Sequence, residues 1–546
     1  MSFRYLYIII VLAALSSQAQ SQLSQTWVSD QGNGTYKNPV LHADYSDPDA
    51  IRVGDDYYMI SSSFEDIPGL PVLHSRDLVN WNLIGHALKQ LQPADHYSTP
   101  QHGGGVWAPS IRFHKNKYFI YFPDPDFGIY MVNADHPAGP WSDPVLVEKG
   151  KGLIDPCPLW DDDGKVYLVH AFAGSRAGIK SILVIKQMNE EGTKTIDNGV
   201  MVYNGHDVDP TVEGPKIYKR NKWYYIFAPA GGVSTGWQLV LRSKNIYGPY
   251  ERKVVMDKGN TEINGPHQGA WVNTKSGEDW FLHFQDKEVY GRVVHLQPMQ
   301  WKNNWPVIGI DKDGDGKGEP VVSYKKPWVS GVQLRFSPPE SDEFNSSAIG
   351  LQWQWMSNPL PSSAFPNPSK GVLTLFAKDL PSNSNNLWMG GNVLLQKFPA
   401  EEFSVTTAIS FHHNKKTEGE YTGMIVMGTD FGGLALKSTK NGLILVYMES
   451  LNAGNNLPAT EKIILENAPF SIFLRTTVIK GGRCSFSYSL NGVDFTEIDK
   501  RFIAKAGKWK GAKIGIFCYG NSITNDAGYS EFDWLRVKGL TKENEN

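Results

Sequence analysis

The chain has 546 residues, with 41% hydrophobic and 12% aromatic residues and a formal net charge of −3. This length allows more than one domain, and the composition is that of a globular rather than a disordered protein. The nearly balanced charge excludes the basic surface that nucleic-acid binding requires, and no apolar run reaches the ~20 residues of a membrane-spanning helix.

The first 20 residues have the pattern of a secretory signal. Arg4 precedes an apolar run from Leu6 to Leu15, and small residues follow at Ser17 to Ala19. The apolar run is too short to span a bilayer, so we expect a cleaved signal peptide over residues 1–20 rather than a buried N-terminal segment. The mature protein is then exported, to the periplasm or, as an alternative, into the medium.

A repeat dominates the sequence from about residue 37 to about residue 325. Five times, a polar or aromatic residue stands beside a proline, ten to thirteen residues before the aromatic residue that starts a hairpin strand. The five marked residues are Asp47, Trp107, Asp155, Glu213 and His267. Short strands repeating at this spacing are typical of propeller blades. The pattern predicts a five-bladed β-propeller within residues 21–330.

The five marked residues define a candidate site. The first strand of each blade lines the central channel of a propeller, so equivalent residues converge there even when they are distant in sequence. Glycoside hydrolysis needs two carboxyl groups, a third carboxylate raises the pKa of the acid, and an indole offers a platform for a sugar ring. Asp-Pro pairs also open turns and tryptophans also fill cores, but the shared position in the repeat favours a site.

Other acidic residues have simpler interpretations. We expect Asp44, Asp49, Asp124 and Asp126 to open turns or to lie in solvated loops. Residues 311–316 resemble the start of a calcium loop, but Val322 stands where the closing glutamate is expected. We therefore interpret this segment as a polar surface loop rather than a metal site.

The texture of the sequence changes near residues 337–341. The repeat ends, and apolar strands such as residues 371–376 and 514–517 alternate with polar turns, which predicts a lectin-like β-sandwich over residues 331–546. We expect this domain to pack on the propeller and to lend a loop to the rim of the pocket. Three cysteines cannot form a disulfide framework. Cys484 and Cys518 could pair, whereas Cys157 is expected to be a packed small residue.

Four motifs of the repeat resemble glycoside hydrolase family 43, the five-bladed propeller enzymes that release arabinose or xylose. They are residues 46–52, 105–109, 154–156 and 212–215. The resemblance implies that Asp47 is the general base, that Glu213 is the general acid and that Asp155 raises the pKa of the acid and orients it. The implied reaction is single-step inversion.

The same resemblance implies roles for further residues. Arg292 matches an arginine that contacts sugar hydroxyls, and Phe64 and Phe127 fall on loops that wall the subsite for the terminal sugar. His267 matches a channel histidine beside a bound calcium ion or its waters. No cofactor is required by this chemistry, although a structural calcium ion in the channel is implied.

The function expected from the sequence is an exo-acting α-L-arabinofuranosidase. Residues 205–211 and 228–233 look most like the branch that trims arabinofuranose from hemicellulose side chains, such as those of xyloglucan or arabinoxylan. β-D-Xylosidase activity is the alternative, because the two terminal sugars present similar hydroxyl layouts. A fructan or sucrose hydrolase would differ at all three acid motifs, and a sugar-binding propeller without activity would have lost the acid or the base.

Overall fold

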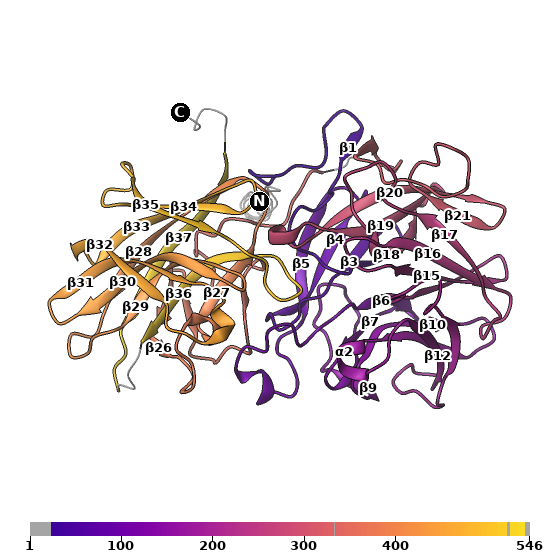
Figure 1. Ribbon diagram of the computed structural model, residues 1–546, viewed down its shortest axis with the longest axis horizontal. Helices are drawn as coiled ribbons and strands as arrows, with labels where there is room; N and C mark the ends of the chain where they lie inside the picture. Colours follow the sequence, from indigo (N-terminus) through magenta and orange to yellow (C-terminus); the bar gives the residue numbers. More distant parts are fainter. Residues whose placement is uncertain (1–22, 332–333, 521–524, 541–546) are drawn as a thin grey trace, which may run out of the picture.

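The computed structural model describes residues 23–331, 334–520 and 525–540, so the predicted signal peptide lies outside the described residues. Nearly all regular structure is β, in a five-bladed propeller followed by a sandwich (Figure 1). Within the described part of the chain, no helix is long and apolar enough to cross a membrane. The predicted fold class is confirmed.

Each blade is a four-stranded antiparallel sheet whose strands follow one another in sequence order. The blades consist of β2 (Asp49–Val53), β3 (Asp56–Ile60), β4 (Gly69–Ser75) and β5 (Trp81–Leu88); β6 (Ser110–His114), β7 (Lys117–Asp124), β8 (Gly128–Ala134) and β9 (Val145–Lys149); β10 (Leu153–Trp160), β11 (Val166–Phe172), β12 (Ile182–Met188) and β13 (Val200–Asn204); β14 (Lys216–Arg220), β15 (Trp223–Ala230), β16 (Trp237–Ser243) and β17 (Glu251–Met256); and β18 (His267–Asn273), β19 (Asp279–Asp286), β20 (Arg292–Lys302) and β21 (Trp305–Ile308).

The position of a strand within its blade explains its composition. The second strand is covered on both faces by neighbouring blades, so β15 is a nearly continuous apolar run with seven of its eight residues buried. Outer strands such as β13 face solvent and carry no buried residue. The marked residues of the repeat stand at the start of the innermost strands, where backbone pairing ends and an adjacent proline is tolerated.

Both ends of the propeller contribute to its closure. β1 (Thr35–Lys37) pairs with β22 (Ser323–Lys325), which joins the segments that precede the first blade and follow the last. The segment after β1 continues along the fifth blade, where Leu41 forms a β-bridge with Val294. Closing the circle in this way holds the first and fifth blades together and fixes the channel that the inner strands line.

The C-terminal domain is a sandwich of two antiparallel sheets with one edge strand added in parallel. One sheet contains β23 (Gln354–Trp355), β26 (Lys378–Asp379), β27 (Val393–Lys397), β29 (Tyr421–Met427), β30 (Phe431–Thr439), β31 (Gly442–Ser450), β32 (Thr460–Ala468) and β36 (Lys513–Gly520); the other contains β24 (Ala364–Asn367), β25 (Val372–Phe376), β28 (Phe403–His412), β33 (Ser471–Ile479), β34 (Arg483–Ser489), β35 (Thr496–Ile503) and β37 (Tyr529–Gly539). The strictly alternating burial of β28 shows one face turned to the core between the sheets.

Among the residues that the structure describes, helical structure is limited to single turns. These are α2 (Gly174–Ala177) and the 3-10 turns η1 (His96–Ser98), η2 (Glu288–Tyr290), η3 (Leu387–Met389) and η4 (Ala453–Asn455). All three cysteines are buried and free, so Cys484 and Cys518 do not form a disulfide in this structure. Cys157 is fully buried, as expected of a packed residue.

The sandwich packs directly on the first and fifth blades (Figure 1). Ile67 in the first blade and Trp355 in β23 form a β-bridge across the interface. The loop between β35 and β36 reaches the propeller, where the Ala512 N–H donates to the carbonyl of Val289 at 2.7 Å. Trp509 in this loop lines the cavity at the mouth of the channel, as expected for a sandwich that lends a loop to the pocket rim.

Candidate active site

The mouth of the propeller channel holds a cavity with a volume of about 130 Å³. Its walls combine residues from all five blades with one from the sandwich: Asp47, Phe64, Trp107, Ala108, Ile154, Asp155, Glu213, Val233, Gln268, Arg292 and Trp509. Four of the five residues marked by the repeat line this cavity. The fifth, His267, is fully buried directly behind Glu213.

The blades present these residues at closely similar positions. Asp47 lies two residues before β2, and both Trp107 and Glu213 lie three residues before β6 and β14. Asp155 lies within β10, where a register shift between Ile154 and Cys157 releases it from regular pairing. The convergence predicted from the repeat therefore exists in the structure, and each of these residues lies just before an inner strand or at an interruption of its pairing.

Several cavity residues have a left-handed backbone. The φ angles are 54° for Asp47, 51° for Phe64, 58° for Asp155, 35° for Gln268 and 68° for Trp509. Such conformations cost about 1–3 kcal/mol for residues other than glycine and persist where the surrounding structure holds them. Because these conformations are concentrated around one cavity, we infer a functional site in which side chains are oriented toward the cavity at a cost in local stability.

Asp47 is a buried carboxylate with two partners, one hydroxyl group and one guanidinium group. Its Oδ2 accepts a hydrogen bond of 2.5 Å from the Ser62 hydroxyl. The Arg292 guanidinium lies 3.3 Å from Oδ1 and 3.4 Å from Oδ2. Arg292 itself is anchored through its backbone N–H, which donates to Asp44 at 2.9 Å. The predicted neighbour of the sugar, Arg292, thus also lies against the predicted base.

Asp155, Glu213 and His267 form a connected group. Asp155 Oδ2 accepts a 2.7 Å hydrogen bond from the N–H of Gly214, the residue after Glu213. Glu213 Oε1 lies 2.9 Å from His267 Nε2. Burial raises the pKa of Asp155 well above its ordinary range, and the negative charge of Glu213 raises it further, against the lowering effect of the Gly214 N–H.

Three aromatic rings form the walls of the cavity. Phe64 and Trp107 come from the first two blades, and the ring of Trp509 lies 5.9 Å from that of Trp107 at 67°. Trp509 comes from the loop between β35 and β36, and no motif in the sequence identified it. Val233, which ends the motif of residues 228–233, also lines the cavity, and so does Gln268, which no motif identified.

Phe127 does not have the position expected for it. Of the residues that the structure describes around the cavity, Phe127 is not one that lines it. Its ring packs instead against His96 and Tyr97, at centroid distances of 5.3 and 6.4 Å.

Three acidic residues expected in turns or solvated loops are buried. Asp44 accepts from the N–H groups of Arg292 and Gly511, which links the fifth blade to the sandwich loop. Asp49 lies in β2 and binds Arg112 at 2.7 Å. Asp124 accepts from the Tyr97 hydroxyl at 2.5 Å, and burial raises its pKa to about 7. Long-range partners, which turn chemistry alone does not reveal, explain their burial.

The calcium ion implied at His267 stays a prediction. Calcium takes about six to eight oxygen ligands. The polar neighbour of the imidazole is a single carboxylate, Glu213, and the buried Nδ1 has no hydrogen-bond partner among the described residues. These residues do not by themselves form a calcium cage, and we derive no chemical step from a metal.

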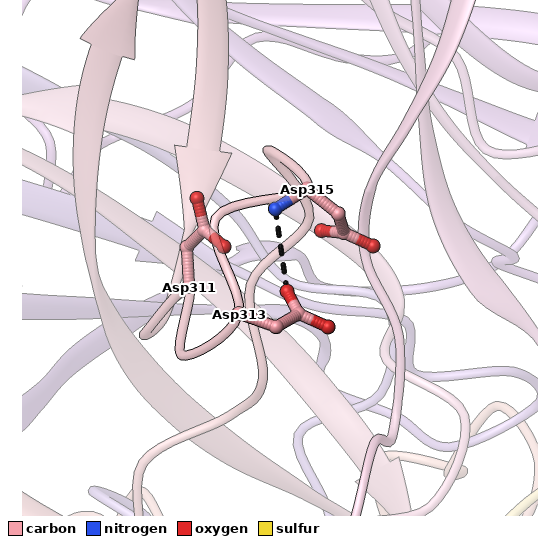
Figure 2. Close-up of side chains that lie close together, drawn as sticks. All are labelled: Asp311, Asp313 and Asp315. Atoms are coloured by element: carbon pink, nitrogen blue, oxygen red, sulfur yellow. Dashed lines mark hydrogen bonds between the residues drawn. The ribbon is translucent and has the colours of Figure 1, made fainter.

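The acidic loop outside the cavity brings Asp311, Asp313 and Asp315 together, with ligand atoms within 4.8 Å of one another (Figure 2). Their carboxylates already accept hydrogen bonds from the backbone of the same loop, such as Asp315 N–H to Asp313 at 3.3 Å. Lys302 also lies 3.2 Å from Asp311. These contacts fit the interpretation of residues 311–316 as a polar surface loop.

Comparison with known proteins agrees with this geometry. Residues 36–306 match the model of glycosyl hydrolases family 43, and residues 341–538 match that of the β-xylosidase C-terminal concanavalin A-like domain. A protein from Xylanibacter ruminicola is 39% identical over 486 residues, covering 89% of this chain and 86% of the relative. The chain belongs to glycoside hydrolase family 43.

Two further relatives differ in the activity that they are named for. A protein from Formosa agariphila, named Beta-xylosidase, is 32% identical over 593 residues and covers 97% of both chains. A protein from Bacteroides ovatus, named Non-reducing end alpha-L-arabinofuranosidase BoGH43B, is 28% identical over 536 residues, covering 93% of this chain and 95% of the relative. This family 43 chain is thus a glycosidase with a carbohydrate substrate.

Proposed function

We propose that this protein is an exo-acting, inverting β-D-xylosidase that removes terminal xylose from hemicellulose oligosaccharides. The observation that carries the proposal is the meeting of Asp47, Asp155 and Glu213, from three different blades, at one small cavity. Two carboxyl groups suffice for acid and base, and a third tunes the acid. A cavity of about 130 Å³ is below the ~300–1,000 Å³ of typical ligand pockets, which favours one terminal sugar over a polysaccharide chain.

Asp47 is the proposed general base. The Ser62 hydroxyl and the Arg292 guanidinium both stabilise its charged form, which is the form that takes a proton from water. In inversion, that water attacks the anomeric carbon from the face opposite the leaving group. We expect about 6.5–9.5 Å between the carboxyls of base and acid, the separation that leaves room for the water.

Glu213 is the proposed general acid, with Asp155 as its partner. Burial and the charge of Glu213 raise the pKa of Asp155, so the two carboxyl groups act as one electrostatically coupled pair. Glu213 is the more accessible of the two, with a side chain 29% exposed, whereas Asp155 is almost fully buried. The proton is therefore delivered to the glycosidic oxygen by Glu213, while His267 and the Asp155–Gly214 hydrogen bond orient it.

The choice of sugar rests on the relatives. The sequence motifs favour arabinofuranose, but the relatives named Putative beta-xylosidase and Beta-xylosidase are 39% and 32% identical to this chain, against 28% for the arabinofuranosidase. We therefore place xylose first. α-L-Arabinofuranosidase activity is the second candidate, supported by the Bacteroides ovatus relative. Export through the predicted signal peptide, to the periplasm or the medium, is part of the proposal, since hemicellulose is an extracellular polymer.

The test compares aryl β-D-xyloside, aryl α-L-arabinofuranoside and sucrose as substrates of the mature protein. We expect the highest kcat/KM on the xyloside and no turnover of sucrose. A higher kcat/KM on the arabinofuranoside would make α-L-arabinofuranosidase the first candidate. If the protein hydrolysed neither pentoside, both candidate functions would be rejected. NMR of the first product should show the anomer opposite to that of the substrate, and retention would reject Asp47 as a base acting through water.

A further inference from the structure

One buried carboxylate, Glu65, is connected to the segments that carry all three aromatic walls of the cavity. Its side chain is 0% exposed, and it directly follows Phe64 in the chain. Phe64 is held by a two-way backbone bridge, in which its N–H donates to Val106 at 2.8 Å and its carbonyl accepts from Val106 at 3.0 Å. A carboxylate buried this completely requires partners for its charge, and the partners of Glu65 lie on the loops that carry Trp107 and Trp509.

The first set of partners is the loop that carries Trp107. Glu65 Oε1 lies 3.1 Å from His102 Nδ1, and Oε2 accepts from the Gly103 N–H at 3.2 Å. The carbonyl of Gly103 in turn accepts from the indole N–H of Trp107 at 3.0 Å. Glu65 thus holds the peptide group of Gly103 in place, and this peptide group in turn holds the Trp107 indole.

The second partner is Lys510, the neighbour of Trp509 in the sandwich. Lys510 Nζ lies 2.6 Å from Glu65 and 2.8 Å from Asp66, and its side chain is 8% exposed. A buried ion pair loses heavily when one partner is removed, because the other charge is left unpaired. Trp509 itself is 44% exposed, so the adjacent ion pair, rather than burial of the ring, holds it over the cavity.

Nothing in the chemistry of hydrolysis requires Glu65, because it does not line the cavity or touch the proposed acid and base. We propose that Glu65 is the positioning residue for the sugar-binding walls, which it sets by holding the Trp107 loop and the Trp509 loop at a fixed separation. The identity of the bound sugar in this proposal rests on the proposed function, whereas the placement of the walls by Glu65 does not. Through Lys510, the sandwich becomes part of the binding site instead of a separate module.

The main variant is Glu65→Gln, which keeps the shape of the side chain but removes its charge. We expect kcat/KM on the aryl xyloside to fall by about 10²-fold, the effect of a misplacement of roughly 1 Å, mostly through a higher KM. Lys510→Met should show the same change, and Lys510→Arg should recover much of the wild-type KM. This second pair keeps the test valid if Glu65→Gln does not fold.

A matched control is available in the propeller. Lys326 also lies between two buried carboxylates, at 2.6 Å from Asp30 and 2.8 Å from Asp77, with a side chain 14% exposed. Lys326→Met breaks a comparable ion cluster that does not contact the cavity. We expect it to lower the melting temperature but to leave KM unchanged, which separates positioning from stability.

Amide hydrogen exchange provides a readout that does not depend on activity. In Glu65→Gln, exchange should rise in both residues 101–107 and residues 505–512, and neither segment should change in Lys326→Met. A wild-type KM in both Glu65→Gln and Lys510→Met, or increased exchange in only one segment, would overturn the proposal. If the wild-type protein turned over no pentoside, the proposed function would fail, while the exchange data would still decide the role of Glu65.

Discussion

The mouth of the propeller and the sandwich loop of residues 505–512 build the same cavity by different means. The propeller supplies Asp47, Asp155 and Glu213 from equivalent positions at the starts of inner strands, each held by the rigid meander behind it. The sandwich supplies one residue, Trp509, from a connecting loop held by an ion pair. Reactive groups thus come from the repeated part of the fold, and a wall that limits access comes from the part that is not repeated.

This difference predicts which substitutions change chemistry and which change binding. A carboxyl group fixed by a blade cannot be replaced by its neighbours, because each of the three blades that supply an acid presents only one carboxyl group to the cavity. A wall residue shares its contact area with other rings, so its loss is partly compensated. Substitutions in the two regions should therefore differ in magnitude and in the kinetic constant that they affect.

The largest effect is expected for Glu213→Gln. The amide cannot donate a proton to the leaving oxygen, so kcat/KM should fall by about 10²–10⁴-fold on xylosides with poor leaving groups. Aryl xylosides with good leaving groups need less protonation and should lose much less. Steady-state kinetics over a series of aryl xylosides measures this leaving-group dependence.

An equal loss across that series would contradict the role of Glu213 as the acid. Asp155→Asn is the matched variant, because it alters the same pair without removing the proposed donor. It should lower activity, but its activity should depend less on the leaving group than that of Glu213→Gln.

A smaller effect is expected for Trp509→Ala. Aromatic contacts contribute about 0.5–1.5 kcal/mol beyond the burial of their area, so KM for the aryl xyloside should rise by about tenfold with kcat nearly unchanged. Trp328→Ala is the control, since Trp328 is 66% exposed and does not line the cavity. A fall in kcat at constant KM would show that the sandwich contributes to chemistry and would remove the contrast between the two regions.

A buried acid outside the repeat provides the next test. Asp124 has a pKa of about 7, raised by burial, so the folded protein keeps its proton at a pH where the unfolded chain has released it. Its contribution to stability is therefore complete below about pH 4 and is lost as pH rises through 7. Asp124→Asn should avoid about 2–3 kcal/mol of the stability loss between pH 5 and pH 8.

Melting temperatures of the wild-type protein and Asp124→Asn at the two pH values measure this effect. The pH profile of kcat should stay the same, because Asp124 pairs with Tyr97 and does not line the cavity. A shifted kcat profile would mean that an acid outside the repeat also tunes the chemistry.

The parts of this molecule that the sequence predicts are those with a period. The spacing of the five marked residues predicts the number of blades, and the shared position of Asp47, Asp155 and Glu213 predicts the meeting of the acids, because strands repeat at fixed intervals around one axis. The alternation of apolar and polar residues predicts the sandwich, although not the order of its strands. In each case, regular backbone hydrogen bonding converts a local sequence pattern into a regular arrangement of strands.

Contacts without a period escaped prediction. Glu65 and Lys510 are 445 residues apart, and Asp44 and Gly511 are 467 residues apart. Nothing near either partner in the sequence announces the other, so Asp44 has the appearance of a turn residue and Trp509 that of an exposed loop residue. The packing of one domain on the other determines these contacts.

Phe127 tests the limit of inference from resemblance, and the smallest effect is expected there. The resemblance placed it at the sugar subsite, whereas its ring packs against His96 and Tyr97 in the second blade. Phe127→Leu keeps most of the apolar volume, so KM and kcat should each change by less than about threefold, with a cost in stability of about 1 kcal/mol. Phe64→Leu is the matched substitution at a ring that does line the cavity, and it should raise KM more than Phe127→Leu does. Equal changes in KM for the two variants would mean that the loop carrying Phe127 closes over the sugar during turnover, and a blade loop would then share the limiting role that the structure gives to the sandwich.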